Sequence, residues 1–249
     1  AAINRFGFNS GGLEAYALRL EAQHGRPGIV GANVGKNKET ERAENDYAVG
    51  IERVTPLSDY IVVNISSPDT EGLRALQARE SLSQLLGASM EARARAIPDG
   101  GRVPPLLVKV APDLEFAEMQ DIADVVMASE IDGLVIGNTT VDRPTDLRSA
   151  EKSQAGGLSG RPLMEKSTAC LAEFYRLTDG KVPLVGCGGV ASGADAYAKI
   201  RAGASLVQLY TALVFQGPAL VGRIKRELAA LLKQDGFANV SEAIAADHT

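Results

Sequence analysis

Residues 106–126, LLVKVAPDLEFAEMQDIADVV, contain the two kinds of element from which the rest of the fold is predicted. The first six residues form a short apolar run that does not alternate with polar residues, which is typical of a parallel strand covered on both faces. After Pro112 the apolar residues recur at helical spacing, so a helix with one buried face is expected. The apolar side chains on that face are those of Phe116, Met119, Ile122, Ala123 and Val126.

Further runs rich in Val, Ile and Leu occur along the chain, with amphipathic segments between them. These runs are IVGANVG at 29–35, YIVVNIS at 60–66, GLVIGN at 133–138, PLVGCGG at 183–189 and SLVQLYTAL at 205–213. Alternation of strands and helices indicates an α/β fold, either a doubly wound sheet or a (β/α) barrel. No Pro/Ser-rich linker or shift in composition divides the chain, so residues 1–249 are predicted to form one domain.

Three more helices are predicted from their start signals and spacing. One begins at Ser192, with Asp195 in a capping-box arrangement, and another follows Pro218. A long helical stretch covers 72–96. The uncharged stretch 202–222 approaches the length of a membrane span, but polar and helix-breaking residues interrupt it, and a buried strand followed by a helix start is the better prediction.

The overall composition excludes several classes of function. The chain has 26 basic and 31 acidic residues and a formal net charge of -5, which argues against nucleic acid as a partner. Cys170 and Cys187 have no CxxC spacing, so neither a disulfide framework nor a metal site is indicated. The only histidines are His24 and His248, so we expect any general base to be another kind of residue.

Polar residues stand at or just beyond the carboxyl ends of four predicted strands. In a parallel barrel these ends converge on the active site. For any one such residue, capping of the next helix is the simpler explanation, but four strands together predict a site. The residues are Asn33, then Asn64 with Ser66 and Ser67, then Lys109, and then Asn138 with Thr139 and Thr140.

Lys109 is the most informative of these residues because an ammonium group within an apolar strand requires an anion or a ligand. Both a structural ion pair and a ligand contact satisfy that requirement. The segment 186–189 is a second indication, since its glycines allow the backbone to approach a ligand closely. Ser192 then opens a helix whose N-terminus is expected to receive an anion such as phosphate, with a merely tight turn as the alternative.

Eight segments spread over the chain resemble dihydroorotate dehydrogenases. They are INRFGFNS at 3–10, NVGKNK at 33–38, NISSPDTEGLR at 64–74, LVKVAPD at 107–113, GNTT at 137–140, GGLSGRPL at 156–163, GCGGVASG at 186–193 and RAGASLVQLYTAL at 201–213. The resemblance implies an FMN-dependent (β/α)₈ TIM barrel that oxidises dihydroorotate to orotate in de novo pyrimidine (UMP) biosynthesis. The soluble class has Cys where this chain has Ser67, so the resemblance is to class 2, which reduces a quinone and associates with a membrane.

The resemblance also implies roles for individual residues. Ser67 would be the general base that removes the C5 proton of dihydroorotate while the C6 hydride passes to the flavin. Residues implied to bind FMN are Asn33, Asn64, Lys109, Gly137, Gly160, Gly189, Tyr210 and Thr211. Residues implied to bind the substrate are Asn4, Arg5, Phe6, Gly7, Phe8, Asn64, Ser66, Ser67, Asp69, Asn138 and Thr139. No metal is implied.

The chain departs from the family pattern in three ways. Asp69 replaces the usual Asn, and a carboxylate there would repel the anionic orotate unless it is turned away or protonated. Gly137 replaces the usual Thr and offers only backbone contacts. Six strands are predicted where the barrel has eight, so this chain is expected to lack the N-terminal strands, the first FMN loop, the substrate lysine and the membrane-binding helices. The implied location is the cytoplasmic face of a bacterial inner membrane or the mitochondrial inner membrane.

Two other functions remain open on the residues alone. The first is another FMN barrel, such as the soluble class or a dihydropyrimidine oxidoreductase module, against which Ser67 argues. The second is a truncated barrel piece without cofactor or catalysis. Flavin absorbance of the purified protein would separate this second alternative from the enzymes.

Overall fold

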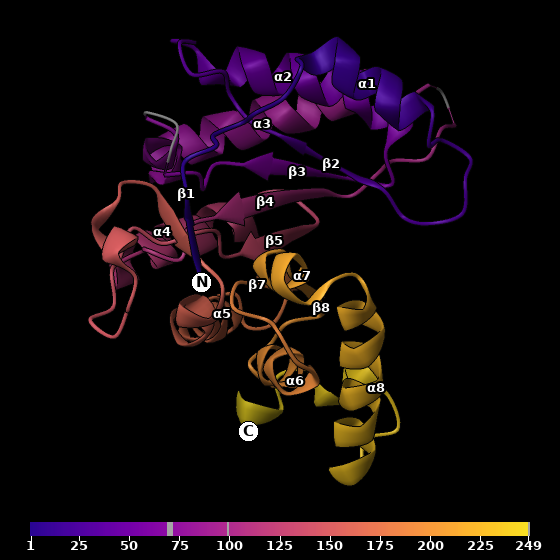
Figure 1. Ribbon diagram of the computed structural model, residues 1–249. Helices are drawn as coiled ribbons and strands as arrows, with labels where there is room; N and C mark the ends of the chain where they lie inside the picture. The colour runs from indigo at the N-terminus through magenta and orange to yellow at the C-terminus, as the bar shows by residue number, and fades with distance from the viewer. Residues whose placement is uncertain (69–71, 99, 249) are drawn as a thin grey trace.

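The computed structural model describes residues 1–68, 72–98 and 100–248. A curled sheet of six parallel strands forms its centre and makes an open part of a (β/α) barrel (Figure 1). In spatial order the strands are β2 (Gly31–Val34), β3 (Tyr60–Asn64), β4 (Leu106–Val110), β5 (Gly133–Ile136), β7 (Leu184–Cys187) and β8 (Leu206–Gln208). Each coincides with one of the apolar runs, so the predicted parallel α/β architecture is confirmed.

Helices connect the consecutive strands and cover the outer face of the sheet. In Figure 1, α1 to α3 lie along the upper side of the sheet, whereas α5 and α6 are seen end-on, which displays the curl of the layer. The helices are α1 (Leu13–Glu21), α2 (Ala43–Val54), α3 (Arg79–Arg95), α4 (Phe116–Ala128), α5 (Met164–Leu177), α6 (Gly193–Arg201), α7 (Thr211–Gln216), α8 (Ala219–Gln234) and α9 (Val240–Ala243). Short 3-10 turns are η1 (Thr55–Leu57), η2 (Arg74–Gln77), η3 (Ala150–Ser153), η4 (Arg161–Leu163) and η5 (Ala246–His248).

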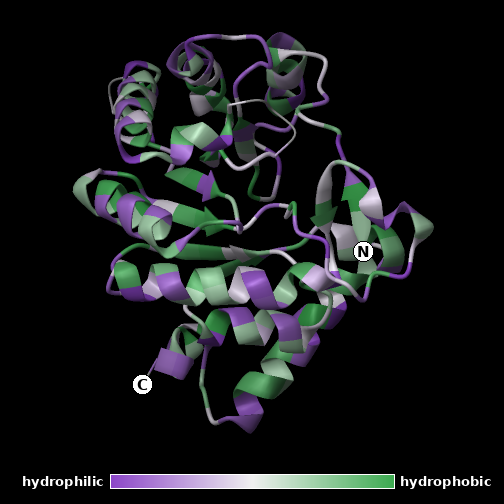
Figure 2. Cartoon of the chain, turned by 90° about the vertical axis from the view of Figure 1, so that its left-hand side faces the viewer, coloured by the Kyte–Doolittle hydropathy of each residue, from purple (hydrophilic) through white to green (hydrophobic). Residues whose placement is uncertain are grey.

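The two faces of the sheet carry different side chains. Outward-pointing residues such as Ile61, Val108 and Leu134 are fully buried against the helices. The strands are accordingly the apolar centre of Figure 2, while the helices show both hydrophilic and hydrophobic residues. On the inner face Val62, Val135 and Val185 form a smaller apolar layer. Because side chains alternate along a strand, the polar strand-end residues lie on this inner face beyond the valines.

The helix predictions are confirmed except at 72–96. The helix after Pro112 begins at Phe116 behind a capping box of Glu115 and Glu118. The stretch 72–96 is not one helix, because Ala78 is extended and separates η2 from α3. Tertiary contacts explain the break, since the Gln77 side chain accepts a hydrogen bond from the Ala111 backbone (2.9 Å).

The uncharged stretch 202–222 forms β8, α7 and the start of α8, as the polar and helix-breaking residues predict. Within the described part of the chain, no helix has the length and apolar character needed to cross a bilayer.

A second, two-stranded sheet was not expected. β1 (Ala2–Asn4) pairs antiparallel with β6 (Gly157–Ser159), and Thr140 forms a bridge to Leu158. Three-residue strands are too short to show a pattern in the sequence. The pairing matters because it brings the N-terminal motif beside the loop that follows β5.

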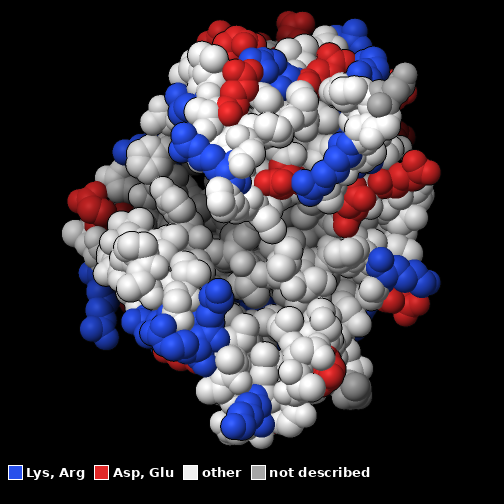
Figure 3. All heavy atoms as spheres, turned by 90° about the vertical axis from the view of Figure 1, so that its right-hand side faces the viewer, with Lys and Arg blue, Asp and Glu red and all other residues white. Residues whose placement is uncertain are grey.

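The inner face is open on one side of the molecule. Among the described residues, β2 and β8 each pair with a single neighbour, and Leu206, Val214 and Phe215 near the β8 edge are exposed. Figure 3 views the molecule from the right-hand side of Figure 1 and shows a hollowed centre almost without charge, with charged groups around its rim.

Candidate active site

The carboxyl ends of β3 and β4 bring an amide and an ammonium group together. Asn64 and Lys109 are register partners, and Val135 of β5 lies on the other side of Lys109. Lys109 is half-buried, and across residues 1–68, 72–98 and 100–248 its ammonium makes no hydrogen bond or ion pair. The structural ion pair that the sequence left open is therefore not formed by these residues, and the cation is available to a ligand.

A short hydrogen-bond network fixes the amides at these strand ends. The Ser66 hydroxyl donates to Asn64 Oδ1 (2.7 Å), and Asn138 Nδ2 donates to the Ser66 hydroxyl (2.8 Å). Ser66 is fully buried, and its hydroxyl is used by these two bonds. The geometry thus favours a positioning role for Ser66 over the direct substrate contact that was predicted.

Ser67 follows in the same loop and is buried. The loop is held by Arg74, whose guanidinium reaches the segments after three neighbouring strands. It donates to the carbonyl oxygens of Ser66 (3.2 Å) and Thr139 (3.1 Å) and to the Asp113 carboxylate (2.9 Å). Planar forked donors suit such a three-way contact. Arg74 therefore sets the relative positions of the loops after β3, β4 and β5.

Asp113 is the anion at the centre of this arrangement. Desolvation of the half-buried carboxyl acts to raise its pKa, but hydrogen bonds from Lys166, Thr140, the Val141 backbone and Arg74 outweigh it and hold the pKa below its usual range. The carboxylate is therefore ionised at neutral pH and satisfied by its neighbours. Its role is to anchor the loops, and no acid or base function is indicated.

The loops after β6, β7 and β8 gather at a second corner of the site. Gly160 lies beside Thr211, and Thr211 donates from its hydroxyl to Ser159 Oγ (2.9 Å). Gly189 has φ of 81°, and a Cβ there would lie 2.5 Å from Met164 Cα, so only glycine fits. The loops that carry the predicted residues Gly160, Gly189 and Thr211 therefore lie next to one another. Tyr210, which was also predicted to bind FMN, is 78% exposed.

One expectation about this corner is wrong. Two N–H groups in the first turn of α6 are already used, because the Gly193 amide donates to the Glu227 carboxylate (2.6 Å) and the Asp195 amide donates to the Ser192 hydroxyl (3.2 Å). The Asp195 carboxylate accepts from the Ala191 amide. Two carboxylates at this helix start disfavour another anion, which leaves the glycine turn before it as the candidate phosphate position.

Gly137, at the end of β5, has φ of 112°, and a Cβ would lie 2.4 Å from the Cys187 carbonyl oxygen. Glycine is therefore required by the local backbone, which gives a physical reason for the departure from threonine.

The N-terminal motif spreads along the rim of the site. Asn4 pairs with Gly157, against which Thr139 packs, and the Phe8 ring lies over Gly35 just beyond β2. The other predicted residues of this motif lie at the surface. Arg5 donates to the Ala155 carbonyl (3.0 Å), Phe6 is 73% exposed and Gly7 is exposed. Asn33 is exposed on the inner face of β2. Asp69 lies outside the described residues.

No role was predicted for Arg74, Asp113 or Lys166, although the first two stand within the matched motifs. Arg74 and Asp113 could have been recognised from the sequence, because each is a charged residue that follows the polar end of a predicted strand. Such a residue is a candidate to hold the loop after that strand in place. Lys166 pairs with Asp113 (2.8 Å) from α5, and nothing in its sequence neighbourhood indicates this.

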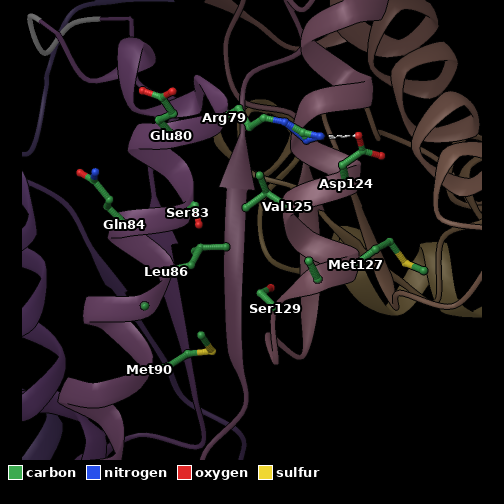
Figure 4. A pocket seen from close by; sticks show the side chains of 12 residues that line it. Arg79, Glu80, Ser83, Gln84, Leu86, Met90, Asp124, Val125, Met127 and Ser129 are labelled. Carbon is green, nitrogen blue, oxygen red and sulfur yellow. Dashed lines mark hydrogen bonds and ion pairs between the residues drawn. The ribbon is translucent and has the colours of Figure 1, made fainter.

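A hollow between α3 and α4 lies on the outer helical layer, away from the strand ends (Figure 4). Arg79 crosses it to pair with Asp124 (2.6 Å). Its lining does not include Asn64, Asn138 or Lys109, so this hollow is not the candidate active site.

Known proteins resemble this chain over nearly its whole length. The family model for dihydroorotate dehydrogenase matches residues 1–232. A dihydroorotate dehydrogenase (quinone) of Azorhizobium caulinodans is 59% identical over 98% of this chain and 69% of its own length. The mitochondrial dihydroorotate dehydrogenase (quinone) of Mus musculus is 51% identical over 100% of this chain and 64% of its own length.

Solved structures give the same result. A dihydroorotate dehydrogenase of Eimeria tenella, in complex with ferulenol, superposes with a TM-score of 0.94 at 43% identity, over 99% of this chain and 71% of the other. The resemblance seen in the motifs and the expected barrel class are confirmed. The chain belongs to the dihydroorotate dehydrogenase family, and its relatives from Azorhizobium caulinodans and Mus musculus are named as quinone-dependent enzymes.

Proposed function

We propose that the protein oxidises dihydroorotate to orotate with FMN as its bound cofactor and a quinone as the final electron acceptor, in de novo pyrimidine (UMP) biosynthesis. The single observation that carries the proposal is Lys109, a half-buried cation without a protein partner in the described chain, beside the amide of Asn64. Such a group stabilises negative charge that develops on a neighbouring ligand.

The residues at the strand ends fit FMN. Lys109, Asn33 and Asn64 offer a cation and two amides to the polar edge of the ring system. Backbone turns at Gly160 and Gly189, where a side chain would not fit, suit close approach of the phosphate end, with Gly137, Tyr210 and Thr211 completing the proposed set. When bound, FMN supplies the acceptor for the hydride that leaves the substrate.

The remaining polar groups are proposed to hold dihydroorotate and move its proton. Asn64 and Asn138 are each held in one orientation by a hydrogen bond with Ser66, which supports the proposal that their amides bind a planar imide-containing ring. Ser67, next in the same loop, takes the proton from C5. A serine hydroxyl is a weak base, so its proton must pass onward as the substrate proton arrives. The other proposed substrate contacts are Asn4, Arg5, Phe6, Gly7, Phe8, Asp69 and Thr139.

The quinone and the membrane belong to the same proposal. They are supported by the names of the relatives, which include bacterial and mitochondrial quinone-dependent enzymes. We accordingly place the protein at the cytoplasmic face of a bacterial inner membrane or at the mitochondrial inner membrane.

Purification of the full-length protein tests the proposal. It should carry oxidised-flavin absorbance and should oxidise dihydroorotate faster with a quinone than with fumarate as acceptor. A preference for fumarate would indicate the soluble class instead. Protein without flavin, and unable to take it up, would indicate a non-catalytic barrel.

Replacement of Arg74 tests the positioning of the loops. Arg74→Ala removes three hydrogen bonds that hold the Ser67 loop to the loops after β4 and β5. We expect kcat for dihydroorotate oxidation to fall roughly 10²-fold, as misplacement of catalytic groups by about 1 Å does. Steady-state kinetics with urea unfolding of the same samples measures both activity and stability.

Arg79→Ala is the matched control, because Arg79 also pairs with aspartates but lies on the outer layer. It should leave kcat near the wild-type value. If both variants retain wild-type kcat, Arg74 does not position the loops.

A further inference from the structure

Lys199 of α6 is a buried charge that the proposed reaction does not use. Its relative exposure is 0%, and its ammonium donates to the hydroxyls of Ser167 (2.8 Å) and Thr168 (3.1 Å) on α5. In the described ranges no carboxylate forms an ion pair with it. Two neutral hydroxyls compensate a buried ammonium poorly, so this arrangement costs stability unless another charge balances it.

The position of Lys199 connects it to the glycine turn. Its side-chain stem lies against β7, where a Cβ built on Gly186 would be 2.9 Å from Lys199 Cδ. Ser167, which accepts from Lys199, donates in turn to the Gly188 carbonyl oxygen (3.1 Å). The ammonium is therefore two hydrogen bonds away from the turn proposed to approach the phosphate.

The titratable groups that face Lys199 do not neutralise it. They are Asp195 on α6, Cys187 on β7 and Cys170 on α5. The Asp195 carboxylate is bound by the Ala191 amide and the Ser192 hydroxyl. Burial raises the pKa of Cys170 to about 12, so that thiol stays neutral. Burial lowers the pKa of Lys199 to about 8, as expected for a cation in a site that lacks its counter-charge.

We propose that Lys199 is a positioning residue for a phosphate monoester dianion at the Gly188–Gly189 turn, acting through Ser167 and through its charge beneath the turn. The inference rests on the proposed function, since the dianion would be the phosphate of FMN. The competing explanation is that Lys199 only ties α6 to α5. The two explanations differ in whether the phosphate itself is recognised.

Comparing the binding of two flavins distinguishes these two explanations of Lys199. Dissociation constants of FMN and of riboflavin, which lacks the phosphate, would be measured by fluorescence on apoprotein made from the full-length protein. Lys199→Met keeps a stem of similar shape and removes the charge. We expect it to weaken FMN on the order of tenfold or more, the effect of one charge on a nearby dianion at an effective dielectric constant of about 20, and to leave riboflavin unchanged.

Lys181→Met is the control for charge removal, because Lys181 is exposed and paired with Asp179 at the other end of β7. It should change neither constant. If Lys199→Met does not fold, Ser167→Ala cuts the connection to Gly188 while keeping the charge. That variant should also weaken FMN more than riboflavin, by a smaller factor.

The pH dependence supplies a second readout. A dianion beside Lys199 raises its pKa, so FMN binding should take up a proton when the pH exceeds about 8. The affinity of the wild type for FMN should then fall as the pH rises above that value, more steeply than for Lys199→Met and not for riboflavin. Calorimetry in two buffers of different ionisation enthalpy counts the proton.

Equal weakening of FMN and riboflavin by Lys199→Met, or no proton uptake in the wild type, would overturn the inference and leave a structural lysine. Wild-type protein that binds neither flavin would overturn the proposed function and this inference together. The two failures are therefore distinguishable.

Discussion

Ser67→Ala in the full-length protein is expected to lower kcat for dihydroorotate oxidation by about 10²–10⁴-fold, the usual contribution of a positioned general base. The reason is that the neighbouring hydroxyl among the described residues of this loop, that of Ser66, is used by Asn64 and Asn138, so Ser67 is the proposed acceptor of the C5 proton. KM should change little because the amides remain. Steady-state kinetics and thermal unfolding of the same preparation measure the effect.

Two further variants make the Ser67 result specific. Ser67→Cys retains a group that can accept a proton and should recover part of the activity. Ser58→Ala removes a buried hydroxyl just before β3, at the opposite end of the strand, and should leave kcat unchanged. Wild-type kcat in Ser67→Ala, combined with no activity in Ser67→Cys, would show that Ser67 is not the base.

Lys109→Met is expected to slow reduction of the bound flavin by dihydroorotate by roughly 10²–10³-fold, comparable to the loss of one electrostatic stabiliser of a transition state. Methionine preserves most of the apolar stem within the strand, so the sheet should remain intact. The substitution removes from the inner face a charge that has no ion-pair partner among the described residues. Anaerobic stopped-flow absorbance measures the rate directly.

Lys233→Met on the exposed side of α8 removes the same charge far from the strand ends and should have no effect. Lys109→Arg keeps the charge on a larger planar group, and an intermediate rate is expected. Flavin reduction at the wild-type rate in Lys109→Met would mean that no negative charge develops beside this side chain.

The sheet could be predicted from the sequence because strands covered on both faces are nearly continuous apolar runs, and all six runs became strands. The pairing of β1 with β6 could not be predicted, because a strand of three residues is too short to show an apolar pattern in the sequence. The break at Ala78 also arises from tertiary contacts, because the Gln77 side chain accepts a hydrogen bond from the backbone of Ala111, which lies just after β4.

The candidate site, like the fold, could be predicted only in part. Polar residues at strand ends could be recognised because the barrel geometry brings them together, and Asn64, Ser66, Lys109 and Asn138 do meet. The prediction that the helix after Ser192 binds an anion was wrong, because the carboxylate of Glu227, on a later helix, accepts the hydrogen bond of the Gly193 amide. Lys199 stood in an amphipathic helix, where a lysine normally indicates the solvent face, and only the packing of α5 against α6 shows it to be buried.

The half-reaction tests the central claim most directly. Dihydroorotate would be mixed anaerobically with the full-length, flavin-containing protein, without any acceptor. We expect the oxidised-flavin absorbance to be lost with one equivalent of substrate and to return when a quinone is added. Flavin that stays oxidised in the presence of dihydroorotate would contradict the proposal that the strand ends of this barrel hold FMN and dihydroorotate together.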